Sequence, residues 1–420
     1  MTEATVRRNW REILLNRKMV ICILQGIASG LPLYVLIQLV PAWLRTSGVD
    51  LGTIGLFALV GIPYTYKFLW SPFLDRFQPG FFGRRRGWML VSQVLVMAAI
   101  GSAGFFDPEM SLEVIVWLTA AVAFFSATQD IVLDAYRREL LAEDELGTGN
   151  SLFVNAYRLS SLIPGSLALI LSDLIPWSQV FMVTAAFMGI GIATTLWIKE
   201  TDGTAKAPAS IKEAVIEPFK EFFGRNGVKP ALAVLAFMFL YKIGDSMATA
   251  LSTPFYLDLG FSATEIGTIA KAAGLWASAA GTLLGGLLML KMTINRALWC
   301  FGFVQIVSIL GFAVLAEVGN NPMLLFAVVS FEYLGVGLGS VALIAYMARQ
   351  TSLAFSATQY ALFASLTALP RTFANATTGF LIEAYGYTHF FLLCTAIAVP
   401  GMLLLFWVAP WNGEDRKAAD

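Results

Sequence analysis

Long apolar stretches alternate with short polar connections along the whole chain. Stretches such as 88–106 and 297–317 run for about 20 residues with few charges, which is enough to cross a bilayer as a helix. The pattern predicts twelve membrane-spanning helices, over residues 19–44, 51–73, 88–106, 112–137, 149–173, 177–198, 229–257, 263–290, 296–317, 322–348, 356–382 and 387–409. We therefore expect an all-α polytopic membrane protein.

The composition excludes several classes of soluble protein. Of 420 residues, 57% are hydrophobic and 13% are charged, whereas soluble domains carry about 45–50% apolar and about 25% charged residues. A soluble enzyme, a disordered protein and a disulfide scaffold are thereby excluded. The three cysteines lie in apolar stretches without a spaced pair, and the chain has a single histidine. We therefore expect no metal site and no cofactor.

The basic residues are distributed unevenly between the two sides of the predicted membrane. Most of the 28 lysines and arginines fall in the two tails and in the even-numbered connections, and only Arg45 falls in an odd-numbered one. Positive charge stays on the cytoplasmic side, so both termini are predicted to be cytoplasmic. The basic segment 1–18 has no small-residue cleavage site, and we interpret it as cytoplasmic sequence, not a signal peptide.

The longest connection divides the chain almost in half. We predict an N-terminal six-helix bundle over 1–198, a cytoplasmic linker over 199–228, and a C-terminal six-helix bundle with a short tail over 229–420. Apolar residues recur at helical spacing within the linker. The linker is therefore either an amphipathic helix on the inner membrane surface or an ordinary tether.

Short motifs recur between the two halves at an offset of about 210 residues. Ile54-Gly55 in the second helix matches Ile266-Gly267 in the eighth, and Ala135-Tyr136 in the fourth matches Ala345-Tyr346 in the tenth. The repeat favours two pseudo-symmetric bundles related by an axis along the membrane normal, an architecture found in transporters with a substrate path between the halves.

Two carboxylates lie four residues apart in the fourth predicted helix. Asp130 and Asp134 share one helix face, and Arg137 continues that face a turn later. Stacked carboxylates in a low-dielectric cavity repel each other, which favours proton binding by one of them. The pair either carries protons or forms ion pairs with Arg137, Arg138 or Arg158.

Ionisable side chains within membrane spans usually face a cavity or a partner. The intramembrane cations are Lys67, Arg158, Lys242 and Arg371. The two arginines have no carboxylate nearby in sequence, so each either binds a substrate carboxylate or pairs with Asp130 or Glu332 across helices.

Glu332 is the clearest intramembrane acid of the second half and a further proton-carrier candidate. Asp245 follows the lysine of the seventh helix by one turn, so these two either bind substrate or neutralise each other.

The connection between the second and third helices combines an acid with a basic cluster. Asp75 and Arg76 precede Arg84 and Arg85 on this predicted cytoplasmic loop. The four residues either form a conformational latch between helix ends or serve only to anchor the topology.

Several motifs resemble those of a known transporter family. They are Gly26-Ile-Ala-Ser-Gly30-Leu-Pro32-Leu, Lys67-Phe-Leu-Trp-Ser-Pro72, Phe81-Phe-Gly-Arg-Arg-Arg-Gly87-Trp and Ser126-Ala-Thr-Gln-Asp130-Ile-Val-Leu-Asp134-Ala. In these the chain looks like the AmpG-type muropeptide permeases of Gram-negative bacteria, within the major facilitator superfamily. The loop with Asp75 is similar to the signature loop of that superfamily.

The resemblance implies the major facilitator fold and a monomeric, proton-driven importer in the bacterial inner membrane. Its cargo would be anhydromuropeptides, that is GlcNAc-anhydroMurNAc-peptides, for peptidoglycan recycling and, in some bacteria, β-lactamase induction. No nucleic acid partner is expected. A carrier of another bulky anion, such as acetyl-CoA, is the alternative. An intramembrane enzyme would need a catalytic constellation that the sequence lacks, and a receptor would leave the repeated halves unexplained.

The same resemblance suggests how the cargo would be held. Asp130, with Asp134 or Glu332 as alternates, would take up a proton outside and release it inside. The intramembrane cations would attract peptide carboxylates. Tyrosine combines a ring with a hydroxyl group, which suits a sugar face or membrane packing. The sugar end would therefore be lined by Gln25, Tyr34, Tyr64 and Gln129.

Overall fold

All regular structure in the described part of the chain is helical. The computed structural model describes residues 16–70, 73–74, 77–80, 82–141, 146–200, 220–225, 227–289, 291–350 and 356–413. Within these ranges ten helices are long and apolar enough to cross a membrane, and 51–66 forms a shorter apolar helix. The last of the ten contains two helices that meet at Gly386, whose φ of 74° is left-handed. The prediction of an all-helical polytopic chain is confirmed.

The third and fourth spans are single helices, whereas the other four of the first six spans contain several helical segments each. The segments of these six spans follow in chain order. They are α2 (Arg17–Tyr34), η1 (Val35–Leu39), α3 (Val40–Thr46), α4 (Leu51–Leu56), η2 (Phe57–Gly61), α5 (Ile62–Tyr66), η3 (Lys67–Leu69), α7 (Arg84–Ala103), α8 (Leu112–Leu140), α9 (Leu146–Leu159), η4 (Ile163–Leu167), α10 (Ala168–Ser172), α11 (Trp177–Ala186) and α12 (Gly189–Trp197). The segments η1 and η4 are π-helical turns, and each interrupts a span that the sequence predicts as one helix.

The helical segments of the later spans also follow in chain order. They are α14 (Val228–Leu240), α15 (Ile243–Ala250), α16 (Ser252–Asp258), α17 (Ala263–Glu265), η5 (Ile266–Ala270), α18 (Lys271–Met289), α19 (Ile294–Val318), α20 (Pro322–Gln350) and α21 (Ser356–Val408). The predicted helix over 229–257 is interrupted at Lys242 and at Leu251. The segment η5 is a third π-helical turn.

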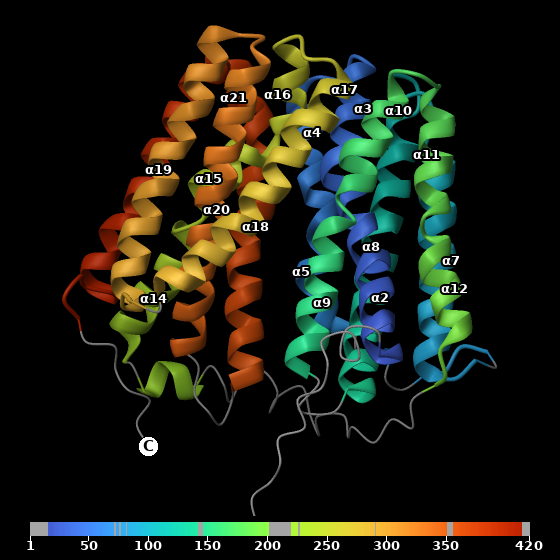
Figure 1. The fold of residues 1–420 in the computed structure, drawn as a ribbon, viewed down its shortest axis with the longest axis horizontal. Coiled ribbons are helices and arrows are strands. Elements are labelled where there is room, and N and C mark those ends of the chain that lie inside the picture. Colours follow the sequence, from blue (N-terminus) through green and yellow to red (C-terminus); the bar gives the residue numbers. More distant parts are fainter. Residues whose placement is uncertain are drawn as a thin grey trace, which may run out of the picture. The chain divides into compact units, whose positions relative to one another are not determined.

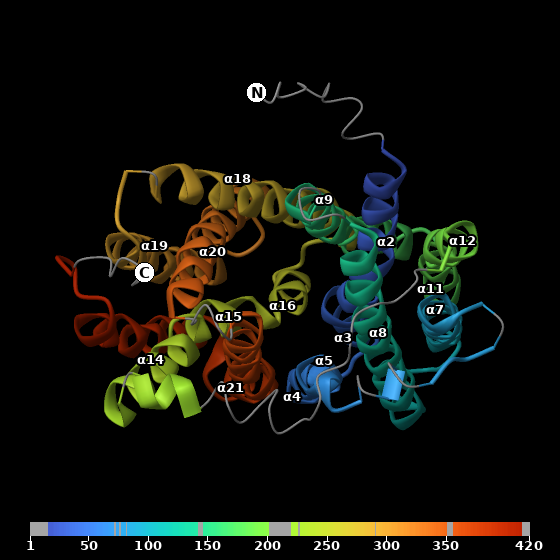
Figure 2. The ribbon, with the colours of Figure 1, turned by 90° about the horizontal axis from the view of Figure 1, so that it is seen from below.

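The described residues form two compact units. The first contains 16–39 and 66–200. In it α2 packs against α8 and α9, α7 packs against α8 and α11, and α12 covers α2 and α7 (Figures 1 and 2). Gly30 allows α2 to approach α9, because a Cβ atom there would overlap the Tyr157 carbonyl group and the Ser160 hydroxyl group.

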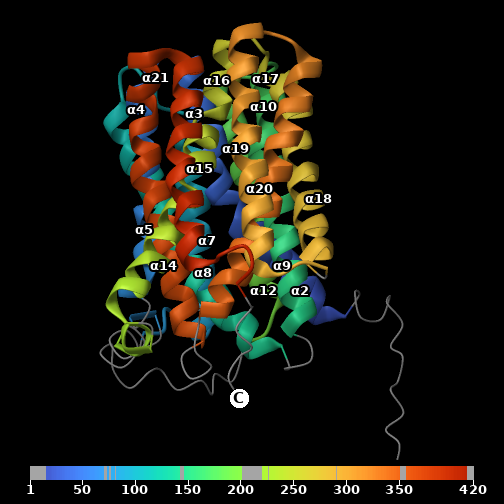
Figure 3. The ribbon, with the colours of Figure 1, turned by 90° about the vertical axis from the view of Figure 1, so that its left-hand side faces the viewer.

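The second unit contains 40–65 and the described residues from 220 onward. In it α18 and α19 pack on α20, and α14, α15 and α19 pack on α21 (Figure 3). The segments α3 and α4 also belong here, because α3 contacts α16 and α4 contacts α21. Residues 40–65, which contain the end of the first span and most of the second, therefore pack with helices from the second half of the sequence.

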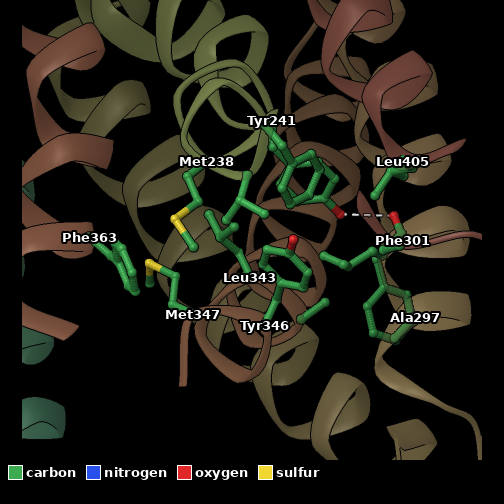
Figure 4. Packing of buried hydrophobic residues seen from close by; sticks show 14 of the residues in the cluster. Met238, Tyr241, Ala297, Phe301, Leu343, Tyr346, Met347, Phe363 and Leu405 are labelled. Carbon is green, nitrogen blue, oxygen red and sulfur yellow. Dashed lines mark hydrogen bonds between the residues drawn. The ribbon is translucent and has the colours of Figure 1, made fainter. Parts of the chain in front are cut away.

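The core of the second unit is a close-packed cluster of apolar and aromatic side chains (Figure 4). Met238, Leu343 and Leu405 are buried in it, and the Phe237 and Tyr346 rings lie 5.1 Å apart. The Tyr241 hydroxyl group donates to the Leu298 carbonyl group at 3.0 Å, so this polar atom is satisfied. Lipid tails are as apolar as leucine, so such clusters stabilise a membrane protein mainly through close packing.

Candidate functional site

The contact between α2 and α8 holds the central carboxylate of the first unit. The Gln129 side chain is buried and donates from Nε2 to the Ala28 carbonyl oxygen at 3.0 Å. At the next position on each helix, the Ser29 hydroxyl group donates to Asp130 Oδ1 at 2.5 Å. Two consecutive hydrogen bonds between the helices therefore fix the position of the Asp130 carboxylate.

A cavity of about 370 Å³ opens beside this contact. It is lined by Ser29, Tyr34, Asp130, Asp134, Phe153, Val154, Tyr157 and Arg158. The rings of Tyr34 and Tyr157 lie 5.8 Å apart with an interplanar angle of 59°. The cavity thus brings together four residues that the sequence predicts for the site. They are the carboxylates Asp130 and Asp134, the guanidinium group of Arg158 and the ring of Tyr34.

Asp134 differs from Asp130 in its surroundings. Arg137 Nη2 donates to Asp134 Oδ1 at 2.7 Å, and Lys67 Nζ lies 4.0 Å from Oδ2. The Asp134 side chain is 53% exposed. Arg137 also donates to Asn150 at 2.8 Å, and its guanidinium carbon lies 3.8 Å from the centre of the Phe153 ring. The local ion pair with Arg137, which the sequence left open, is therefore present.

Arg158 lines the cavity and forms no ion pair within the described ranges. Its side chain makes no hydrogen bond or salt bridge with any residue that the structure describes. The pairing of Arg158 with Asp130, one of the alternatives that the sequence left open, is not seen among the described residues, where Asp130 accepts from Ser29. A guanidinium group has five N–H donors, and none of them is used on a residue that the structure describes.

Two further predicted residues, Gln25 and Tyr64, are not among the residues that line this cavity. Gln25 is buried on α2, and neither its amide oxygen nor its amide nitrogen has a partner among the described residues. The Gln129 amide oxygen likewise lacks one. A buried polar atom without a partner costs about 1–3 kcal/mol, so both amides have capacity for a ligand or water.

The second unit holds an intramembrane ion pair and a buried acid. Lys242 Nζ lies 2.6 Å from Asp245 Oδ2 and donates to Gln305 Oε1 at 3.0 Å. Glu332 is fully buried, and its Oε2 accepts from the Ser308 hydroxyl group at 2.6 Å. Lys242 and Asp245 therefore neutralise each other, which is the second of the two possibilities that the sequence left open.

Some predicted residues lie outside the described part of the structure. Arg371 lies on α21, but its side chain is outside the described residues, as are Asp75 and Arg76. Arg84 is the first residue of α7, and Arg85 forms a buried ion pair with Glu139 on α8 at 2.8 Å. Of the predicted latch, Arg84 and Arg85 are therefore described, and Arg85 pairs with Glu139, a residue that the sequence analysis did not single out.

A second acid reinforces this end of α7. The Glu200 carboxylate accepts from the backbone N–H groups of Arg85 at 2.7 Å and Arg86 at 2.9 Å. An anion at a helix N-terminus interacts favourably with the helix dipole. Arg86 in turn donates to the Thr195 and Leu196 carbonyl groups at the end of α12. The third, fourth and sixth spans are thus tied together at one end.

A cluster of Arg45, Asp258 and Tyr387 joins three spans within the second unit. Arg45 donates to the two Asp258 carboxylate oxygens at 2.6 and 2.9 Å, a bidentate pair. The Tyr387 hydroxyl group donates to the same carboxylate at 2.6 Å. Nearby, Glu383 accepts from the Gly52 N–H group at 2.9 Å. One feature of the sequence could have indicated this cluster: Arg45 is the one basic residue that falls in an odd-numbered connection.

Comparisons with known proteins place this geometry in context. A family model described as Major Facilitator Superfamily matches residues 22–374. An uncharacterized protein from Haemophilus influenzae is 46% identical over 419 residues, covering 96% of this chain and 97% of that protein. The anhydromuropeptide permease of Escherichia coli K12 is 40% identical over 387 residues, covering 92% of this chain and 78% of the permease. The crystal structure of a D-xylose-proton symporter, 11% identical, matches with a TM-score of 0.72 over 94% of this chain and 97% of that one, which shows the shared fold.

Proposed function

The chain belongs to the major facilitator superfamily and to its AmpG-type permeases, and on this premise we propose that it imports anhydromuropeptides together with protons. It is a multi-pass membrane transporter and not an enzyme. The cargo would be peptidoglycan-derived GlcNAc-anhydroMurNAc-peptides, taken across the inner membrane for cell-wall recycling. The 40% identity to the Escherichia coli anhydromuropeptide permease supports this choice of cargo.

The observation that carries the proposal is the mixed chemistry of the cavity in the first unit. An anhydromuropeptide presents sugar faces at one end and peptide carboxylates at the other. The cavity offers two tyrosine rings and an Arg158 guanidinium group that has no protein partner among the described residues. Guanidinium binds carboxylates in a bidentate geometry, and aromatic rings suit sugar faces. Lys67, Gln25, Gln129, Tyr64 and Arg371 stay additional candidates for contacts with the cargo.

The proton-carrying group in this proposal is Asp130. It lies within a membrane span, lines the cavity and has a single neutral hydrogen-bond donor, Ser29. Asp134 is less suited to this role, because it is more exposed and already neutralised by Arg137. Glu332 stays an alternate, since it too is held by one serine hydroxyl group.

Alternating access would move the cargo, as in other transporters built from two repeats. In this proposal the bundles over 1–198 and 229–420 move against each other about the linker, which would break the contacts of 40–65 with α16 and α21. Arg84 and Arg85 would contribute to a latch with Asp75 and Arg76. The protein would work as a monomer, with both termini in the cytoplasm and without a cofactor.

Uptake into proteoliposomes tests this function. Labelled anhydromuropeptide should accumulate when the lumen is more alkaline than the outside, and accumulation should disappear when the pH gradient is collapsed. Labelled acetyl-CoA, the alternative cargo, should show no gradient-dependent uptake. Accumulation of acetyl-CoA in place of the muropeptide would overturn the assignment of the cargo.

A further inference from the structure

A lysine in the eighth span has no acidic partner among the residues that the structure describes. Lys271 is the first residue of α18, and its Nζ donates to the Thr253 hydroxyl group on α16 at 2.6 Å. No carboxylate among the described residues lies within salt-bridge distance of this ammonium group. Lys242 in the same unit, by contrast, pairs with Asp245 at 2.6 Å. The neighbouring acid on the same span, Glu265, is engaged in the capping box with Ser262.

An unpaired ammonium group within a membrane span indicates a place where a ligand can bind. Charged side chains in spans are costly and therefore pair with one another or face a binding site. An ammonium group has three donors, and Lys271 uses one of them on a neutral hydroxyl group. Two donors and the full positive charge are left for a bound anion.

The backbone around this pair is distorted on both helices. Lys271 directly follows the π-helical turn η5, and Thr253 lies just after the break at Leu251, where φ is −113° and ψ is 32°. Interrupted helices often form binding sites in transporters, and π-helical turns are frequent at functional sites. The first unit shows the same association, because η1 starts directly after Tyr34, which lines the cavity there.

We propose that Lys271 and Thr253 form a carboxylate-binding subsite in the second unit. Its ligand is a carboxylate of the peptide part of the cargo, so this inference rests on the proposed function. The ammonium group supplies charge and two hydrogen bonds. The Thr253 hydroxyl group accepts a hydrogen bond from Lys271 and can donate its own proton to the same carboxylate. The subsite is separate from Arg158, which lies in the first unit.

The experiment compares two cargoes in proteoliposomes that contain the full chain. One is an anhydromuropeptide with free peptide carboxylates, and the other is the same molecule with those carboxylates converted to amides. In Lys271→Gln, the KM for the acid should rise about 10-fold or more, as expected for the loss of a charged hydrogen bond, and the KM for the amide should stay unchanged. Lys271→Arg should keep most of the preference for the acid, and Thr253→Val should raise the KM for the acid about threefold.

Lys291→Gln is the matched control, because Lys291 lies just beyond the other end of α18 and is exposed. It should leave the KM of both cargoes unchanged. A Lys271→Gln variant that is well folded by size-exclusion chromatography but keeps the wild-type preference for the acid would overturn the subsite. An equal rise in KM for acid and amide would also overturn it, because that result indicates a structural role.

If the proposed function is wrong, wild-type protein should take up neither cargo. Binding to the subsite is then measured by calorimetry, with D-alanyl-D-alanine and its amide as probes. A preference for the free acid that Lys271→Gln abolishes supports the subsite independently of transport. Equal binding of acid and amide by the wild type, or no binding of either, would overturn it.

Discussion

The two units use their intramembrane charges in different ways. In the first, Arg158 has no partner among the described residues, and Asp130 has one neutral donor beside an open cavity. In the second, Lys242 and Asp245 pair at 2.6 Å, and Gln305 takes a further hydrogen bond from the lysine. Asp130 and Arg158 are thus available at the cavity of the first unit, whereas Lys242 and Asp245 satisfy each other in the second.

This difference separates groups available for ligands from groups that stabilise packing. A charge whose partners are all supplied by the protein has little left to offer a ligand, whereas an unpaired charge within a span is costly unless something binds it. By this criterion Arg158 and Lys271, which have no acidic partner among the described residues, are cations available for ligands, and Lys242 is a structural one. The partners of each charged side chain therefore indicate its function better than the number of charges in a span does.

The largest effect is expected at the accessible carboxylate. Asp130→Asn keeps the shape of the side chain and can still accept the hydrogen bond from Ser29, but it cannot release a proton. We expect gradient-driven accumulation of cargo to be abolished while the protein still inserts. Proteoliposome uptake with and without a pH gradient measures this, and Asp134→Asn is the matched control, which should retain accumulation. Normal gradient-driven uptake by Asp130→Asn would remove this residue from the mechanism.

The paired lysine should affect stability instead. Removing one partner of a buried ion pair typically costs about 3–5 kcal/mol, because the remaining charge is left uncompensated. Lys242→Gln should therefore lower the melting temperature in detergent strongly, and the double variant with Asp245→Asn should recover much of the loss. A single variant as stable as the wild type would show that this pair is not structural, and the contrast between the units would be lost.

Local pairs were predictable from the sequence, whereas pairs between distant residues were not. Asp134 and Arg137, like Lys242 and Asp245, are three residues apart on a helix, so their contact follows from helical geometry. Ser29 and Asp130 are separated by 101 residues. Hydropathy likewise predicted the spans but not the π-helical turns that interrupt them, because these depend on how neighbouring helices pack.

The accessible arginine should change affinity but not stability. Arg158→Lys keeps the charge but loses the planar bidentate geometry, so the KM for an anionic cargo should rise about 10-fold. The melting temperature should stay within error of the wild type, because no protein partner is lost among the described residues. Uptake kinetics and thermal unfolding of the same preparation measure the two quantities. A large loss of stability with unchanged KM would assign Arg158 to the structural class.

A smaller effect is expected at the bidentate pair that attaches the segment 40–65 to the second unit. Arg45 and Asp258 are partly exposed, at 29% and 19%, and pairs near the surface contribute about 1 kcal/mol or less. Arg45→Gln should therefore lower the stability by about 1 kcal/mol, and more in low salt than in high salt. A double-mutant cycle with Asp258→Asn measures the coupling. An absence of coupling would mean that apolar packing alone holds this segment.

The smallest effect is expected at a helix cap in the same segment, which depends on local residues alone. Asp50 caps α4 by accepting from the Thr53 N–H group at 2.7 Å. This hydrogen bond to the charged form lowers the pKa of Asp50 below its ordinary value of 3.8. A lowered pKa stabilises the folded state at pH values above the ordinary one, and this contribution is lost as the pH falls through the folded-state pKa. Asp50→Ala should thus reduce stability at neutral pH by about 1 kcal/mol or less, and the difference from the wild type should shrink in acid. Arg45 bonds to a partner 213 residues away, whereas Asp50 bonds to one three residues away. Comparing the unfolding curves of the Arg45→Gln and Asp50→Ala variants therefore separates the long-range attachment of this segment from its local helix formation.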